Sequence, residues 1–172
     1  MSKILDMLYH EHQVITEFIG KLKLMCMDFM VHDKIDIKQF YKAVEFIKTY
    51  ADGRHHQKEE EILFKAMTDK LGVQAVNLIT HGMLVEHDLA RYHVKELEKS
   101  IKEYEETKSD EAKLNIITFA MGYYYLLERH VFKENKVVYP FGEKNLSSEL
   151  MEELDKQAVI YEEKYADQKI DF

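Results

Sequence analysis

The chain has 172 residues, of which 46% are hydrophobic and 33% charged, with a formal net charge of −8. This composition is typical of one soluble globular domain with a sizeable core. The negative charge disfavours nucleic acid or an anionic membrane as a partner, since both need a basic patch. The single cysteine, Cys26, excludes an internal disulfide and a metal site of several thiolates, and it fits a reducing compartment.

Two features of the sequence indicate a cytoplasmic location. The N-terminus lacks the apolar core of a signal peptide. The longest nearly apolar run, 119–127, is too short to span a bilayer. We therefore expect a cytoplasmic protein.

One proline and six glycines in so long a chain indicate long helices. Apolar residues at three- and four-residue steps predict four of them, over about residues 2–30, 36–67, 73–106 and 111–138. Asp36 and Gln39 form a capping box that opens the second helix. Pro140 is predicted to stop the fourth helix and to leave YPFGEKN as a loop. Ser147 then caps a fifth helix.

Four long helices with short links form an up-down-up-down bundle most economically, so the predicted fold class is all-α. We assign residues 1–141 to a four-helix bundle and 142–172 to a C-terminal loop and an additional helix packed on it. The fifth helix is amphipathic and needs an apolar partner, for which a dimer contact is the alternative. A monomer and a homodimer are both compatible with this pattern.

A shift of 75 residues aligns the two halves of the bundle as pseudo-repeats. The residues that recur are two Glu-His pairs and two HxxxE pairs: Glu11-His12 and Glu86-His87, His55 and His130, Glu59 and Glu134. The adjacent His56 falls on Val131 and does not recur. The shift therefore selects His55 and Glu59 from RHHQKEEEILF (54–64) and predicts other faces for His56 and Glu60.

The recurring residues have the chemistry of a metal pair. Residues i and i+4 of a helix share one face, so each HxxxE motif projects an imidazole and a carboxylate together. Six ionisable groups converging in a core would be very costly without a cation. Two metals, with each glutamate as a bridge and two histidines per metal, would remove that cost. Nitrogen and oxygen donors without thiolate favour iron or manganese, with zinc as an alternative.

Four segments, YHEHQVI, HHQKEEEILF, MLVEHDLAR and HVFKENKVVYP, resemble the signature segments of hemerythrin-like proteins, the HHE cation-binding domain. The resemblance covers about residues 1–141. It implies a four-helix bundle around a non-haem di-iron centre with an oxo or hydroxo bridge. The metal ligands that it implies are His12, His55, Glu59, His87, His130 and Glu134.

Two departures refine the resemblance. Oxygen-carrying hemerythrins have a fifth histidine one turn before the third-helix ligand, where this chain has Met83. The set of four histidines and two glutamates is more similar to that of the repair-of-iron-centres proteins. Those proteins usually carry an N-terminal domain with cysteines, and the chain has none there.

The expected function is binding of O₂, NO or peroxide at the metal pair. One alternative is a di-iron enzyme that reduces NO or peroxide with electrons from a redox partner protein. Another is an iron donor in the repair of iron–sulfur centres. Enzymatic activity stays open, and a purely structural bundle ranks last.

The sequence also predicts where several residues near the expected metal site lie. Tyr123 shares a face with His130, and core packing is favoured over a role near the metals. Surface or inter-helix positions are expected for His56 and His81, and Glu11 and Glu86 are expected to point away from the core. Small side chains at Ala51 and Ala90 favour ligand access on their side of the metal pair.

Overall fold

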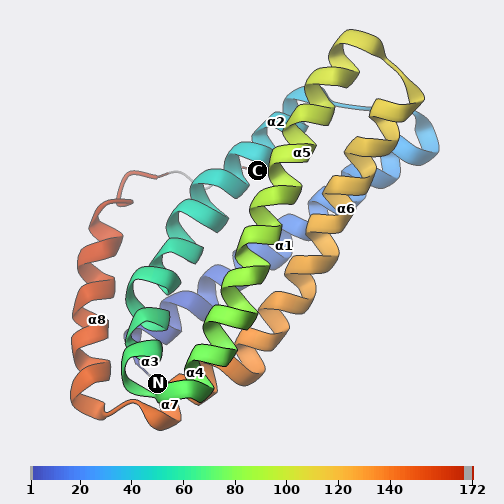
Figure 1. Cartoon of the computed structure of the whole chain (residues 1–172). Coiled ribbons are helices and arrows are strands. Elements are labelled where there is room, and N and C mark those ends of the chain that lie inside the picture. The colour runs from blue at the N-terminus through green and yellow to red at the C-terminus, as the bar shows by residue number, and fades with distance from the viewer. Residues whose placement is uncertain (1, 169–171) are drawn as a thin grey trace.

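The computed structural model of the protein describes residues 2–168 and 172. Four long helices stand side by side and alternate in direction, and a fifth lies along one flank (Figure 1). This arrangement confirms the predicted all-α bundle with an additional C-terminal helix. Within the described residues, no helix is both long and apolar enough to cross a membrane.

The long helices include four π-helical segments, labelled η. The first long helix is α1 (Lys3–His32). The second consists of α2 (Ile37–Phe46), η1 (Ile47–His56), η2 (Glu59–Phe64) and α3 (Lys65–Lys70). The third consists of α4 (Gly72–Leu78), η3 (Ile79–Met83) and α5 (Leu84–Thr107). The fourth consists of α6 (Asp110–Lys133), η4 (Glu134–Val138) and α7 (Tyr139–Asn145), and the fifth helix is α8 (Ser148–Glu163).

The helix ends follow the capping chemistry of the sequence. The Asp36 carboxylate accepts a hydrogen bond from the Gln39 backbone N–H at 3.1 Å, as predicted. The Ser147 hydroxyl accepts one from Leu150 N–H at 3.3 Å and caps α8, also as predicted. Such caps satisfy backbone donors that the first helical turn leaves without a partner.

The predicted loop YPFGEKN is wrong, because these residues form α7. Pro140 lies in the first turn of α7, directly after η4, where backbone hydrogen bonding changes from the π to the α pattern. A proline lacks the N–H donor, and an early position in a helical segment tolerates that loss best. The helix therefore passes through Pro140 and carries Tyr139 on the inner side of the bundle.

The core consists of two apolar clusters with a polar layer between them. One cluster includes Ile15 and Ala90, and the other includes Leu8 and Met83. His12 lies between Leu8 and Ile15 along α1, and His87 stands between Met83 and Ala90 along the third helix. The predicted inner stripes thus face the core, and each is interrupted by its histidine at the same level.

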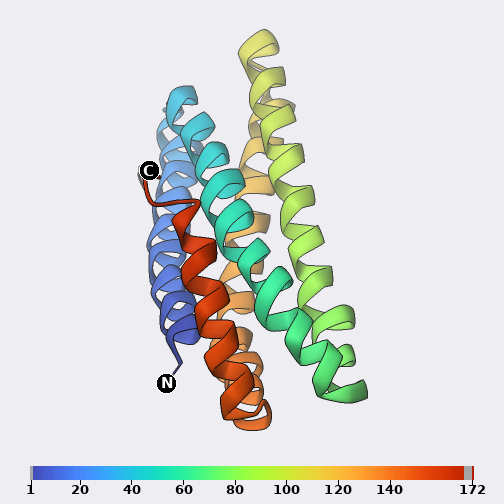
Figure 2. The ribbon, with the colours of Figure 1, turned by 90° about the vertical axis from the view of Figure 1, so that its left-hand side faces the viewer.

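Helix α8 packs against its own chain, along α1 and the second helix (Figure 2). The Ile4 backbone N–H donates to Asp155 Oδ1 at 2.9 Å, and the Tyr165 hydroxyl donates to the Gly53 carbonyl at 2.6 Å. Glu162 forms ion pairs with Arg54 and Lys58. The ion pairs of Glu162 link α8 to the helix segment that carries His55.

Gly53 occupies a tight place in η1. A Cβ atom at this position would lie 2.8 Å from the Lys48 carbonyl oxygen, so the backbone would have to shift. We predict that Gly53→Ala destabilises the protein by about 1–3 kcal/mol, the usual cost of forced overpacking. Urea unfolding of the metal-free protein measures the loss.

Gly20 on α1 supplies the matched control, because a Cβ there meets nothing within 4 Å. Gly20→Ala should stabilise the protein by up to about 1 kcal/mol, as expected in an open helical position. Equal stabilities for the Gly20→Ala and Gly53→Ala variants would show that η1 has room for a side chain.

Cys26 is only 2% exposed and lies in the core, where burial raises the pKa of its thiol to about 12. The reactive thiolate is therefore scarce at neutral pH. We predict that iodoacetamide at pH 8 leaves the native protein unmodified and labels it once after denaturation. Intact-mass spectrometry measures both states, and stoichiometric labelling of the native protein would contradict this environment.

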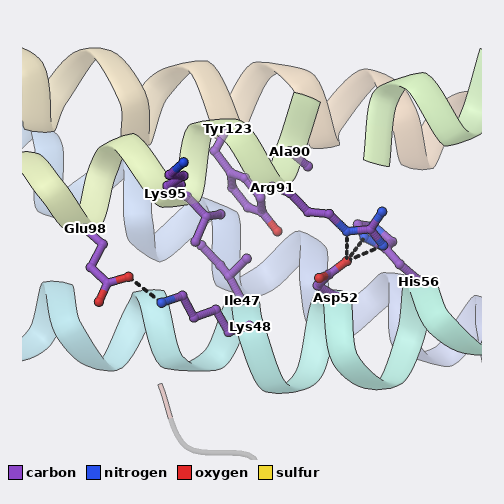
Figure 3. A pocket seen from close by; sticks show the side chains of 10 residues that line it. Ile47, Lys48, Asp52, His56, Ala90, Arg91, Lys95, Glu98 and Tyr123 are labelled. Atoms are coloured by element: carbon purple, nitrogen blue, oxygen red, sulfur yellow. Dashed lines mark hydrogen bonds and ion pairs between the residues drawn. The ribbon is translucent and has the colours of Figure 1, made fainter. Parts of the chain in front are cut away.

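A cavity of about 220 Å³ lies between the second and third long helices (Figure 3). Asp52, His56 and Arg91 close one end of it, and an ion pair between Lys48 and Glu98 closes the other. Two more side chains of interest line it, Ala90 and Tyr123. The cavity is on the side where small residues were expected to favour access, although Ala51 is not part of its lining.

Candidate metal centre

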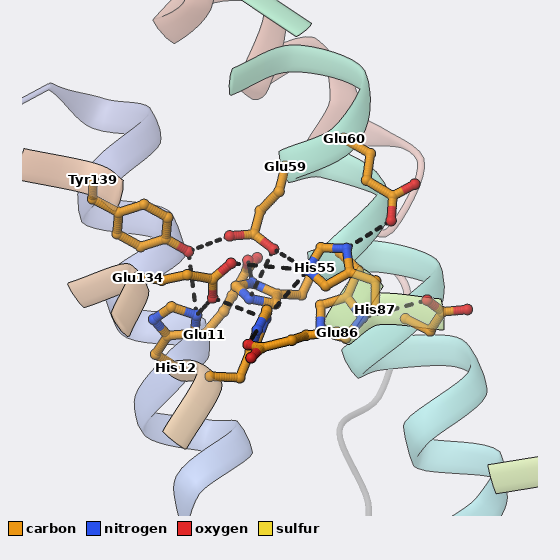
Figure 4. Close-up of polar contacts among 12 residues, drawn as sticks. Glu11, His12, His55, Glu59, Glu60, Glu86, His87, Glu134 and Tyr139 are labelled. Atoms are coloured by element: carbon orange, nitrogen blue, oxygen red, sulfur yellow. Dashed lines mark hydrogen bonds and ion pairs between the residues drawn. The ribbon is translucent and has the colours of Figure 1, made fainter. Parts of the chain in front are cut away.

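The six predicted ligands meet in the polar layer of the bundle, and Figure 4 labels five of them, His12, His55, Glu59, His87 and Glu134. Together with His56 they form two groups that share Glu59, and within each group the donor atoms lie within 4.8 Å of one another. The first group is His12, His55, Glu59 and Glu134, and the second is His56, Glu59, His87 and His130. All of these residues are buried. The sequence therefore predicted the convergence, and the structure adds His56 to it.

Two histidine pairs face each other across the two carboxylates. We call the place beside His12 and His55 the first position, and the place beside His87 and His130 the second position. Glu134 Oε2 lies 3.2 Å from His12 Nε2 and 3.1 Å from His130 Nε2.

Glu59 spans the two positions in the same way. Its Oε2 atom lies 3.6 Å from His55 Nε2 and 3.5 Å from His87 Nε2. Each carboxylate thus reaches both positions, which is the arrangement that two bridging carboxylates need.

Several donor atoms of this layer lack a hydrogen bond. They are buried and comprise both oxygens of Glu134, Oε2 of Glu59 and Nε2 of His55. An unpartnered buried polar atom costs free energy, and native proteins rarely leave several together. A pair of cations would satisfy all of them, so the donor set fits a metal pair.

Burial and mutual charge set the protonation of the layer. Burial and the neighbouring Glu134 raise the pKa of Glu59 well above its usual range. Burial would also raise the pKa of Glu134, but His130 and His12 hold it well below. Burial lowers the pKa of His55 and so favours its neutral, ligand-competent form. A bound cation would offset the burial and the repulsion from Glu134 that raise the pKa of Glu59.

Each of the four predicted histidines has an oxygen partner on its outer nitrogen. The Nδ1 distances are 2.7 Å to Asn135 Oδ1 for His12, 2.8 Å to Glu11 Oε2 for His55, 2.7 Å to Glu60 Oε1 for His87 and 3.0 Å to Glu86 Oε2 for His130. Such partners fix the ring orientation and the tautomer of metal-binding histidines. They leave every Nε2 atom directed into the centre.

The outward orientation predicted for Glu11 and Glu86 is wrong. Each also forms an ion pair with a lysine, Glu11 with Lys58 and Glu86 with Lys133. A residue that precedes a ligand is turned by about 100° from it, which in a bundle is the seam to the next helix and not solvent. Their recurrence at the 75-residue shift was the signal for this role.

Of the two positions predicted for His56, the surface is wrong, because the side chain is buried between the second and third long helices, and His81 is exposed as predicted. His56 is 1% exposed, and its ring stacks on His87 with 4.0 Å between centroids. It ends η1, and a π turn holds more residues than an α turn, so consecutive side chains are less than about 100° apart. His55 and His56 therefore both reach the centre.

Tyr139 is a site residue that the sequence pattern did not indicate. Its hydroxyl donates to Glu59 Oε1 at 2.5 Å and lies 3.2 Å from His12 Nε2. The predicted loop concealed this contact, although the 75-residue shift aligns Tyr139 with Phe64. Tyr123 is buried in the core, and its hydroxyl has no hydrogen-bond partner.

The fold and the buried donor cluster define a helical bundle with groups that could hold metal ions. A family model, the hemerythrin HHE cation binding domain, matches residues 3–141. The chain belongs to this family. A comparison with curated proteins gives no match. The matched segment contains all six predicted ligands, and α8 lies beyond it.

Proposed function

We propose that the protein binds two non-haem iron ions, bridged by carboxylates and by an oxo or hydroxo group, and that the pair binds O₂, NO or peroxide. The observation that carries this proposal is the pair of donor groups sharing Glu59, with Glu134 also between both positions. Two ions held in these groups would be close neighbours. Iron would supply redox chemistry and an open coordination position.

The donor types support iron. Imidazole nitrogens and carboxylate oxygens make up the whole cluster, and Cys26 lies in the apolar cluster outside it. Such a set suits iron or manganese, with zinc as a further candidate, because no soft thiolate takes part.

The surroundings of the first position support a small oxygen- or nitrogen-containing ligand. Tyr139 places a buried hydroxyl donor beside His12 and Glu59, whereas Phe64 is the corresponding residue of the other half. A donor in a dry site can stabilise a small polar ligand by hydrogen bonding.

Tyr139→Phe should therefore retain both metals but weaken azide binding by about tenfold, the equivalent of one hydrogen bond. Azide titration followed by visible absorption measures the affinity, and metal analysis checks the loading. Tyr125→Phe, an exposed change, is the control. Equal azide affinities in the two variants would show that Tyr139 does not form a hydrogen bond with the bound ligand.

The alternatives are a di-iron enzyme that reduces NO or peroxide with a redox partner, and an iron donor in repair of iron–sulfur centres. The set of four histidines and two glutamates, with Met83 in place of a histidine, favours the latter. Anaerobically prepared protein is mixed with O₂, NO or peroxide, and its visible spectrum is followed. A reversible change with O₂ supports carriage, turnover with a reductant supports an enzyme, and iron transfer to an apo iron–sulfur protein supports repair.

A further inference from the structure

The two metal positions are related by the 75-residue shift, but their surroundings differ. The unequal pairs are His56 and Val131, Glu60 and Asn135, and Phe64 and Tyr139. Of these, only His56 adds a nitrogen donor that its counterpart cannot offer. The difference therefore concerns the number of ligands at each position.

His56 has the same arrangement as the four predicted ligands. Its Nδ1 atom is 3.4 Å from Asp52 Oδ1, and Arg91 Nε holds the same oxygen at 2.9 Å. Its Nε2 atom is buried and has no hydrogen-bond partner. An outer carboxylate and a free inner nitrogen are the pattern of a metal-binding histidine.

His56 is also within reach of the other donors of the second position. The donor atoms of His56, Glu59, His87 and His130 lie within 4.8 Å of one another. The ring of His56 is edge-on to His130, with 5.6 Å between centroids. A packing role for His56 would leave the buried Nε2 without a partner, at a cost of about 1–3 kcal/mol.

We propose that His56 is a seventh protein ligand and gives the second position a third imidazole. This inference rests on the proposed metal pair. The second long helix then supplies the imidazole that the third helix lacks at Met83. With two carboxylates and the bridging oxygen, the second position has six donors and the first has five.

The open coordination site is therefore at the first position, beside Tyr139. The cavity on the Ala90 side ends at His56, so it leads to a coordinated imidazole and not to the open site. This replaces the expectation that ligands enter from the side of Ala51 and Ala90.

The test compares wild type with His56→Val, which introduces the residue of the other half. Anaerobic titration with iron(II) measures the two affinities, and Mössbauer spectra of ⁵⁷Fe-loaded protein report each iron separately. His56→Val should weaken one of the two irons by about 10- to 100-fold and change one of two quadrupole doublets, leaving the other intact. His81→Val, at an exposed histidine, should match wild type in both measurements.

A second variant separates ligation from folding. His56→Gly leaves a space next to the cavity of about 220 Å³, and added imidazole should restore the affinity of the weakened iron. Unchanged affinities and spectra in His56→Val would overturn the inference, as would a loss in His56→Gly that imidazole cannot reverse. Failure of wild type to bind two ions would instead overturn the proposed metal pair, so the two failures are distinguishable.

Discussion

Glu134→Ala is expected to abolish binding of both metal ions, since this carboxylate lies between the two positions. Its Oε2 atom is 3.2 Å from His12 Nε2, on one side, and 3.1 Å from His130 Nε2, on the other. Its Oε1 atom is 3.8 Å from His87 Nε2. Removing a terminal histidine would weaken one position, whereas removing this bridge affects both. Elemental analysis after anaerobic iron loading and desalting should fall from about two ions per chain to near zero.

Glu128→Ala is the matched control, because Glu128 is an exposed glutamate one helix segment earlier, on α6. It should retain both ions. Glu134→Gln adds a test of charge: it should lose the ions as well, because a neutral amide cannot replace the anionic carboxylate between the two positions. Retention of two ions by Glu134→Ala would contradict the bridging role.

Glu11→Ala has the largest expected effect on stability. The Lys58 side chain is 0% exposed and forms ion pairs with Glu11 and Glu162. Without Glu11, a buried ammonium keeps one partner, and His55 loses the acceptor of its Nδ1. Breaking a buried ion pair from one side costs about 3–5 kcal/mol, which urea unfolding of the metal-free protein should show.

The second half of the chain contains the control for this change. Glu86→Ala removes the equivalent carboxylate, but its Lys133 partner is 38% exposed and can be hydrated. Its cost should be clearly smaller, at about 1 kcal/mol. The double change Glu11→Leu with Lys58→Met should recover most of the loss, since no charge is left buried alone. Equal costs for Glu11→Ala and Glu86→Ala would show that burial of Lys58 does not matter.

The sequence predicted the bundle and the convergence of six ligands for a simple physical reason. The apolar stripes repeat with the α-helical period, and the two HxxxE pairs keep imidazole and carboxylate on one face. The 75-residue shift then separated His55 from its neighbour in RHHQKEEEILF. These patterns are local and periodic, so they can be recognised in the sequence before the packing of the helices is known.

The errors cluster where the helical period changes. His56 ends one π segment, and Tyr139 directly follows another. A pattern based on 3.6 residues per turn misplaces side chains there, and π turns are common at functional sites. Pro140 lies in the same region. Backbone hydrogen bonding changes there from the π pattern of η4 to the α pattern of α7, and the helix tolerates a residue without an N–H donor.

The sequence did not predict that Glu11 and Glu86 contact His55 and His130, and the reason is different. Glu11 and Glu86 recurred in the sequence, but a residue beside a ligand lies on a seam between helices, and its orientation depends on the neighbouring helix. In the structure that neighbour presents a histidine Nδ1 and a lysine to each carboxylate. The role of Glu11 and Glu86 therefore depends on which side chains of the neighbouring helix face them, and the pattern of one helix alone does not predict this.

The metal pair is tested most directly by counting the metal ions per chain in protein purified and loaded under anaerobic conditions, with the visible spectrum recorded after O₂ is added. We expect about two iron ions per chain and absorption bands of an oxo-bridged pair. Fewer than two metal ions per chain, without such bands, would contradict a di-iron centre in this protein.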